Sequence, residues 1–355
     1  MGNVAADGDL EQMVYYVVSD LSARWGYHGL LQDECCGGTQ RELNVFLFYR
    51  DGQAPAANLV YNTELVATLP DKYRPPALED IDVGSSGING NGRVNFMRVM
   101  YDEMDPMHRL SVIVHEYYHV VQIQQCGGGQ EPEEFSMWLA EGGAMATENL
   151  YLDFYFRADG DSTDTTGAVN SYYNDQLFSD VWGAVASTIA NHADGSFSMG
   201  AALEAYSGAT MNYQAEATAF LYLAHRTSLE YAMVDFVNTG ACNPKPFGSK
   251  DAAFAQAFGT GSDFGTGWSD LQDFYEDFNA WLATSPNPAD LKPTEAQLRA
   301  VFGHSELCSD LCATANDGVC DAECLHGSDC SDCGVTSKPD DFPVAMRAPY
   351  DGGTV

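Results

Sequence analysis

Apolar positions recur at helical spacing in one stretch of the first half of the chain, and polar side chains occupy the positions between them. The apolar set falls on one face of an α-helix: Leu110, Ile113, Val114, Tyr117 and Val121. Asp105 and Pro106 are typical of an N-cap and a first helical position, and Cys126 precedes three glycines that end a helix. The pattern predicts a buried helix between these two signals.

A second helix is predicted directly after the first. Residues 131–134 place a proline and three carboxylates where a helix begins, and an apolar run follows over residues 135–148. The short glycine loop between the two helices would make them antiparallel neighbours. Gly142, Gly143 and Ala144 would let the backbones approach closely.

Periodicity also predicts the other elements of the chain. The expected helices cover residues 9–25, 215–225, 229–237, 252–258 and 271–282, with a further helical stretch after residue 177. The expected strands cover residues 44–49, 57–61 and 93–101, and residues 85–92 are expected to be a glycine- and asparagine-rich loop.

The polar face of the first helix carries the candidate chemistry. His115, Glu116 and His119 form a His-Glu-x-x-His pattern. Helical positions four apart lie one above the other, so both imidazoles can point at one metal ion, and zinc accepts neutral imidazole. Burying these side chains without partners would be costly, so a metal would explain their presence in a buried helix. The antiparallel second helix brings Glu141 back beside them.

The His-Glu-x-x-His segment, followed by Trp-Leu-Ala-Glu-Gly-Gly-Ala at residues 138–144, resembles the gluzincin zinc metallopeptidases. The aminopeptidase and bacterial-collagenase branches look closest, and the resemblance covers residues 93–150 well. It implies an α+β, zincin-like catalytic domain: a small mixed sheet and an active-site helix, then a helical subdomain. It also implies that Glu141 is the third zinc ligand. Glu116 would be the general base for a water whose pKa the zinc lowers.

One position departs from the gluzincin pattern. Many members carry an acidic residue four positions after the ligand glutamate, as a partner of the metal ligands, and this chain has Met145 there. Glu148, two turns along the same face, would substitute, or the surroundings of the ligands are built differently.

A donor to the oxyanion is expected from the helical subdomain. Gluzincin relatives often place a catalytic tyrosine at the start of a helix, and Tyr213 precedes a helical run here, with Asn212 as its N-cap. Tyr206 and His225 are the alternatives.

Composition narrows the classes of function. The chain has 355 residues and a net charge of −35, from 51 acidic and 16 basic side chains. Such a surface excludes generic nucleic-acid binding and argues against docking on anionic membranes. It fits either a saline setting or an ordinary acidic secreted protein. We find no transmembrane stretch and no signal peptide, and we expect an extracellular location from the ten cysteines.

Six cysteines crowd into residues 308–333, with a core that resembles the Lin-12/Notch repeat. The resemblance implies three disulfides around one Ca²⁺, held by Asp317, Asp321 and Asp329. The competing interpretation is a cysteine zinc cluster, which the interleaved aspartates and a single histidine, His326, disfavour. The pairing of the remaining cysteines stays open: Cys35, Cys36, Cys126 and Cys242.

The expected organisation runs from an N-terminal zincin subdomain at 1–150 to a helical subdomain at 151–285. A linker with a short helix at 286–307, the cysteine-rich module at 308–333 and a tail at 334–355 follow. The sequence predicts a secreted zinc endopeptidase that hydrolyses peptide bonds in protein or peptide substrates. Two alternatives remain: a catalytically weak binding or adhesion module on the same fold, and a zinc exopeptidase.

Overall fold

The computed structural model describes residues 17, 21, 42–48, 84–88, 94–100, 106–125, 136–157, 181–193, 203 and 212–302. Side chains are described over most of the helical part. The predictions for residues 57–61, Tyr206 and residues 308–333, with Asp317, Asp321 and Asp329, lie outside the described residues. So do Cys35, Cys36 and Cys126.

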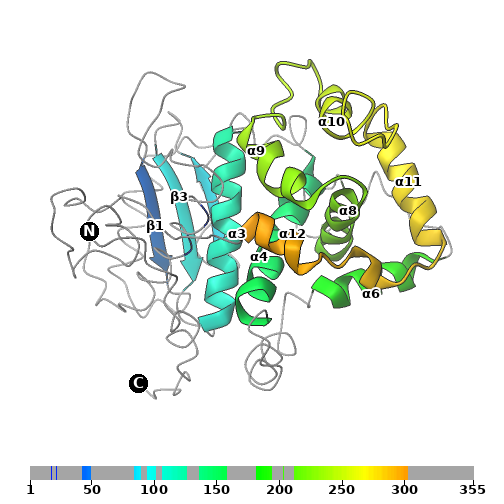
Figure 1. The fold of residues 1–355 in the computed structure, drawn as a ribbon. Helices are drawn as coiled ribbons and strands as arrows, with labels where there is room; N and C mark the ends of the chain where they lie inside the picture. The colour runs from blue at the N-terminus through cyan, green and yellow to red at the C-terminus, as the bar shows by residue number, and fades with distance from the viewer. Residues whose placement is uncertain are drawn as a thin grey trace.

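Three strands form a small sheet beside the first long helix (Figure 1). They are β1 (Glu42–Phe48), β2 (Gly84–Ile88) and β3 (Val94–Met100), in the order β1-β3-β2. β1 pairs with β3 in parallel, from Glu42 opposite Val94 onward, and β2 pairs with β3 antiparallel. The loop predicted at 85–92 is therefore wrong over β2, where backbone pairing with β3 overrides the weak strand propensity of glycine and serine.

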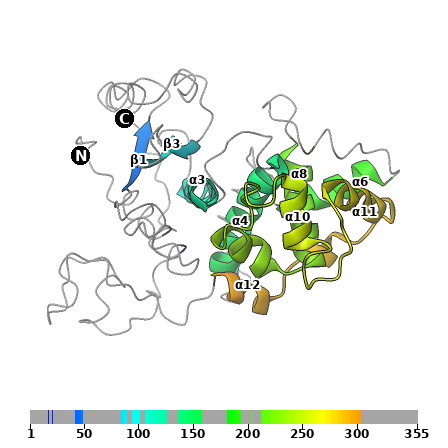
Figure 2. The ribbon, with the colours of Figure 1, turned by 90° about the horizontal axis from the view of Figure 1, so that it is seen from above.

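Two long antiparallel helices form the centre of the fold, as the sequence predicts. α3 (Pro106–Gln125) begins at the expected proline and ends just before Cys126, and α4 (Met137–Arg157) runs beside it. Figure 2 shows α3 between the sheet and α4. Gly143 allows the close approach, since a Cβ there would lie 3.0 Å from the Tyr118 ring of α3.

The other face of α4 packs against α8 (Tyr213–Arg226). A Cβ at Gly142 would lie 2.3 Å from the carbonyl oxygen of Glu216, so only glycine fits at this contact. The predicted N-cap is confirmed, because the Asn212 side chain accepts a hydrogen bond from the amide of Ala215. α6 (Val181–His192) packs on α8 in turn, with a hydrogen bond between Thr218 and Thr188.

An aromatic cluster closes the far side of this helical body. α10 (Lys250–Phe258) and α11 (Leu271–Ala283) appear where the periodicity predicts them. Trp138, at the start of α4, is fully buried and stacks on Phe274 of α11 with ring centroids 4.6 Å apart. Its Nε1 donates to the Tyr275 hydroxyl at 3.0 Å. Together these contacts attach the beginning of α4 to α11.

Short elements complete the body. The helix predicted at 229–237 is interrupted by a π-helical turn, η5 (Tyr231–Asp235), before α9 (Phe236–Asn238). Beyond α11 lie η6 (Pro288–Leu291) and α12 (Glu295–Phe302), inside the stretch expected to be a linker with a short helix. Phe302 of α12 is buried against Tyr151 of α4, with ring centroids 5.7 Å apart.

The predicted α+β fold class is wrong for the body that the structure describes. Wherever side chains are described, the chain is helical or forms connecting loops, and helix-on-helix packing builds the buried core. The paired segments are only seven, five and seven residues long, so the sheet they form is small beside the helical body. None of the described helices is both long and apolar enough to cross a bilayer.

Candidate metal centre

Three side chains from the two central helices converge on one point. His115 and His119 come from α3 and Glu141 from α4. The Nε2 atoms of the two histidines are 3.1 Å apart. The Glu141 Oε2 atom lies 3.3 Å from Nε2 of His119 and 3.4 Å from Nε2 of His115. The four-residue spacing and the glycine-lined helix contact thus bring the three predicted residues together.

The size of this triangle fits a tetrahedral metal ion. Ligands about 2.0–2.1 Å from tetrahedral zinc lie about 3.3–3.4 Å from one another. The three measured edges, from 3.1 to 3.4 Å, are close to that value. The three ligand atoms therefore have the spacing of one face of a tetrahedral coordination sphere.

The outer nitrogen of His119 is held by a buried amide. Gln122 donates from its Nε2 to the carbonyl oxygens of Leu139 and Ala140, at 3.2 and 3.3 Å. Its Oε1 therefore faces His119 and accepts a hydrogen bond from Nδ1 at 2.8 Å. This arrangement puts the proton on Nδ1 and leaves the Nε2 lone pair directed at the triangle.

The outer nitrogen of His115 faces a carboxylate instead. The Oε2 atom of Glu148 lies 3.2 Å from Nδ1 of His115, and Glu148 is only 2% exposed. Asn149 donates to the other Glu148 oxygen at 3.3 Å. Glu148 thus supplies the carboxylate that position 145 lacks. It does so from one helical turn further along α4 than the gluzincin pattern places its acidic residue.

The electrostatics follow from these contacts. Burial alone would lower the pKa of His115, but contacts with Glu141 and Glu148 outweigh it and hold that pKa well above its ordinary value. Burial also opposes a charge on His119, whose pKa Glu141 nevertheless raises. The two histidines in turn hold the pKa of Glu141 far below its usual range, against the effect of burial. Two lone pairs and a carboxylate oxygen pointing at each other need positive charge between them, supplied by protons or by a metal cation.

Glu116 lies within the same buried turn. It is 7% exposed, and its negative charge contributes to the raised pKa of both histidines. Its carboxylate is therefore close to the triangle without being one of the three converging ligands. The sequence-based prediction assigns this carboxylate the role of general base.

The candidate oxyanion donors are separated by the length of α8. Tyr213 begins this helix and is 36% exposed, and the first turn contacts α4 through Glu216 and Gly142, next to Glu141. His225 lies nine residues beyond Glu216, which is about 14 Å along a helix. Tyr213 is thus at the end of α8 that approaches Glu141, and His225 is at the opposite end.

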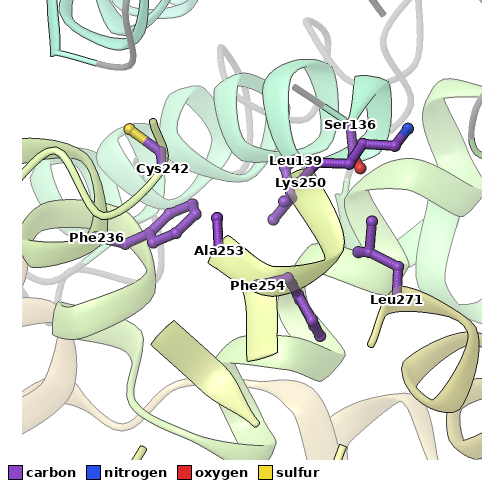
Figure 3. A pocket seen from close by; sticks show the side chains of 8 residues that line it. All are labelled: Ser136, Leu139, Phe236, Cys242, Lys250, Ala253, Phe254 and Leu271. Atoms are coloured by element: carbon purple, nitrogen blue, oxygen red, sulfur yellow. The ribbon is translucent and has the colours of Figure 1, made fainter. Parts of the chain in front are cut away.

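A separate hollow lies at the junction of α4, α9, α10 and α11 (Figure 3). Its walls are largely apolar, with Leu139, Phe236, Phe254 and Leu271 among them. None of the three converging residues lines it, and Cys242, which does, is disulfide-bonded. We interpret it as a packing defect between helices.

Sequence reasoning missed Gln122. The signal was available, because His115, His119 and Gln122 are spaced by four and three residues and so form one polar stripe along the helix. A stripe of this kind predicts that all three side chains face the same neighbour.

Comparison with known proteins gives no match of any kind: no family model, no curated protein and no solved structure matches the chain. Inference about function therefore depends on the chemistry of this centre and on the residues that form it.

Proposed function

We propose that this chain is a zinc-dependent peptidase of the gluzincin type that hydrolyses peptide bonds in protein or peptide substrates. One observation carries the proposal: Nε2 of His115, Nε2 of His119 and Oε2 of Glu141 form a triangle of zinc-ligand size. Two contacts with the outer ring nitrogens support it. Gln122 accepts from Nδ1 of His119 and so directs the inner lone pair of that ring into the triangle, and the Glu148 carboxylate lies 3.2 Å from Nδ1 of His115.

The chemistry would be divided among the residues as follows. His115, His119 and Glu141 would hold the ion, which when bound supplies Lewis acidity and lowers the pKa of a coordinated water. Glu116 would accept a proton from the attacking water and return it to the leaving amine nitrogen. Tyr213 would donate a hydrogen bond to the oxyanion that develops on the attacked carbonyl.

The proposal includes an extracellular location. Cys242 is disulfide-bonded, and disulfides persist mainly in oxidising compartments.

The test pairs zinc content with peptide cleavage. The chain, purified without added metal, is assayed for bound zinc and for hydrolysis of a quenched fluorescent peptide library. Glu116→Gln should keep zinc and lose at least about a hundredfold in cleavage rate, because it removes the base but no ligand. Glu141→Ala should lose the zinc itself. Glu276→Gln, on the exposed face of α11, is the matched control and should change neither quantity.

Two outcomes would contradict the proposal. If Glu116→Gln cleaves as fast as the parent chain, the His-Glu-x-x-His helix is not the active site. If the parent holds zinc but cleaves no peptide, a binding module that retains the metal centre becomes the better description.

A further inference from the structure

The two histidines of the metal centre are supported in chemically different ways. His115 faces a carboxylate, Glu148, that can only accept a proton or a hydrogen bond when ionised. His119 faces an amide, Gln122, that accepts on one side and donates on the other. The amide nitrogen donates hydrogen bonds to backbone carbonyls of α4, which an ionised carboxylate could not do.

We propose that Gln122 is a positioning residue that joins His119 to the backbone of α4 immediately before Glu141. This inference rests on the proposed metal site. The buried side chain of Gln122 fixes the tautomer and ring orientation of His119. The same side chain fixes the position of α4 along α3. The two ligands on α3 and the one on α4 are thereby held at the separation that the ion requires.

The location of the contact supports this role. The carbonyls that accept from Gln122 belong to Leu139 and Ala140, the two residues directly preceding Glu141. Gln122 is 4% exposed, so water competes little for these hydrogen bonds. A sliding movement of α4 along α3 would break both bonds as well as the ligand triangle, so the two are mechanically coupled.

Replacement by glutamate separates this inference from a simpler one. If Gln122 served only as an acceptor for Nδ1 of His119, Gln122→Glu would preserve or improve that function. If Gln122 joins the two helices, Gln122→Glu removes both donors and places a carboxylate against two carbonyl oxygens. Gln122→Met keeps the shape of the side chain and removes its acceptor and donors together.

The experiment measures metal affinity rather than turnover. Zinc affinity is determined by competition with a chromophoric chelator, and the ligand field is read from the visible absorption of the Co²⁺-substituted protein. We expect both Gln122→Glu and Gln122→Met to weaken zinc binding by about 10- to 100-fold, the usual effect of losing a partner of a metal-bound histidine. We also expect an altered Co²⁺ spectrum in both. Gln256→Glu is the control: it removes an amide-to-carbonyl bond to Gly261 far from the centre and should leave zinc affinity and spectrum unchanged.

The outcomes test the joining role of Gln122 and the proposed metal site separately. Parent-like zinc affinity and Co²⁺ spectrum in Gln122→Glu would overturn the joining role and leave the metal site intact. If Gln122→Glu weakens zinc binding while Gln122→Met binds zinc like the parent, the effect comes from the added charge. That result would also overturn the joining role. A parent chain that binds neither metal would overturn the proposed function, and this inference with it. Thermal unfolding of each metal-free variant shows whether the chain still folds. In each variant that folds, the ¹⁵N chemical shifts of His119 report the tautomer of its ring.

Discussion

Gly142 and Glu216 meet so closely that no side chain fits between them: a Cβ on Gly142 would lie 2.3 Å from the Glu216 carbonyl oxygen. The contact joins α4 to the first turn of α8, one residue away from the proposed metal ligand Glu141. The obstacle is backbone, which cannot move aside as a flexible side chain would. The position of Glu141 therefore depends on the absence of a single methyl group at its neighbour.

Gly142→Ala is expected to destabilise the protein and to weaken metal binding together. Forcing extra volume into a packed interface costs typically about 1–3 kcal/mol, and a clash with backbone belongs at the upper end. Urea unfolding of the metal-free protein measures the first effect, and chelator competition measures the second. Gly143→Ala is the matched comparison, since its nearest neighbours are the rings of Tyr118 and Phe220, at 3.0 and 3.1 Å. If Gly142→Ala loses no more stability than Gly143→Ala, the backbone clash at Gly142 does not control the contact between α4 and α8.

The stabilisation that zinc provides is expected to grow with pH. In the metal-free protein, Glu141 and Glu148 raise the pKa of His115, and Glu141 raises that of His119, against the effect of burial. Groups with a raised pKa stabilise the folded state fully below their unfolded value, about 6.5, and lose that contribution as the pH rises through the folded value. Zinc instead requires neutral imidazoles, so protons compete with it at low pH.

The measurement is the difference in melting temperature with and without zinc. We expect a larger difference at about pH 8 than at about pH 6, because the metal-free form loses its proton-mediated contacts while the metal-bound form gains neutral ligands. If the difference in melting temperature does not change with pH over this range, zinc does not displace protons from these histidines.

Tyr213→Phe should slow catalysis without affecting the metal. Loss of one oxyanion donor typically lowers kcat by about 10²–10³-fold. Zinc content should stay at the parent level, since the phenol is not among the three converging ligands. His225→Ala, at the far end of α8, is the comparison and should cleave at the parent rate. The reverse result, slow His225→Ala and normal Tyr213→Phe, would show that the substrate lies elsewhere.

Asp277 is expected to stabilise the body of the protein through one oxygen. Its Oδ2 accepts from the Tyr222 hydroxyl at 2.9 Å, from Nε1 of Trp268 at 3.2 Å and from Arg226. The Arg226 guanidinium lies 5.6 Å from the centroids of both the Tyr222 and the Trp268 ring. Asp277→Asn should cost about 1–2 kcal/mol, a value reduced because about a third of this ion pair is open to solvent.

Salt dependence checks the electrostatic origin of this contribution. The difference between parent and Asp277→Asn should shrink in high salt, because exposed charges are screened. Asp263→Asn, on an exposed loop, serves as the control and should be neutral. A salt-independent loss would assign the effect to hydrogen-bond geometry instead.

The helix periodicity and the spacing of His115, His119 and Glu141 could be recognised in the sequence, because both are properties of short segments. The sequence predicted Glu148 only as an alternative to an acidic residue at position 145. Its contact with His115 depends on which turn of α4 faces that histidine, and the sequence does not specify this. Gln122 was not foreseen, because a glutamine carries no motif and acts here through carbonyls on another helix. The α+β class failed because local strand patterns show where a segment can extend, whereas the class of the described body follows from how much of it packs as helices.

The metal centre is local in sequence, whereas the packing that supports it is remote. Every side chain of the centre lies between residues 115 and 148, so few residues separate the ligands and little loop entropy is lost in gathering them. Trp138, three residues before Glu141, is nevertheless held by Tyr275, 137 positions later. A fragment ending after α4 would thus contain every proposed metal ligand and yet lack Tyr275, whose hydroxyl accepts the hydrogen bond from Trp138 at the start of α4. Truncation would then create a chain that can still capture zinc loosely but cannot hold the geometry of the complete site.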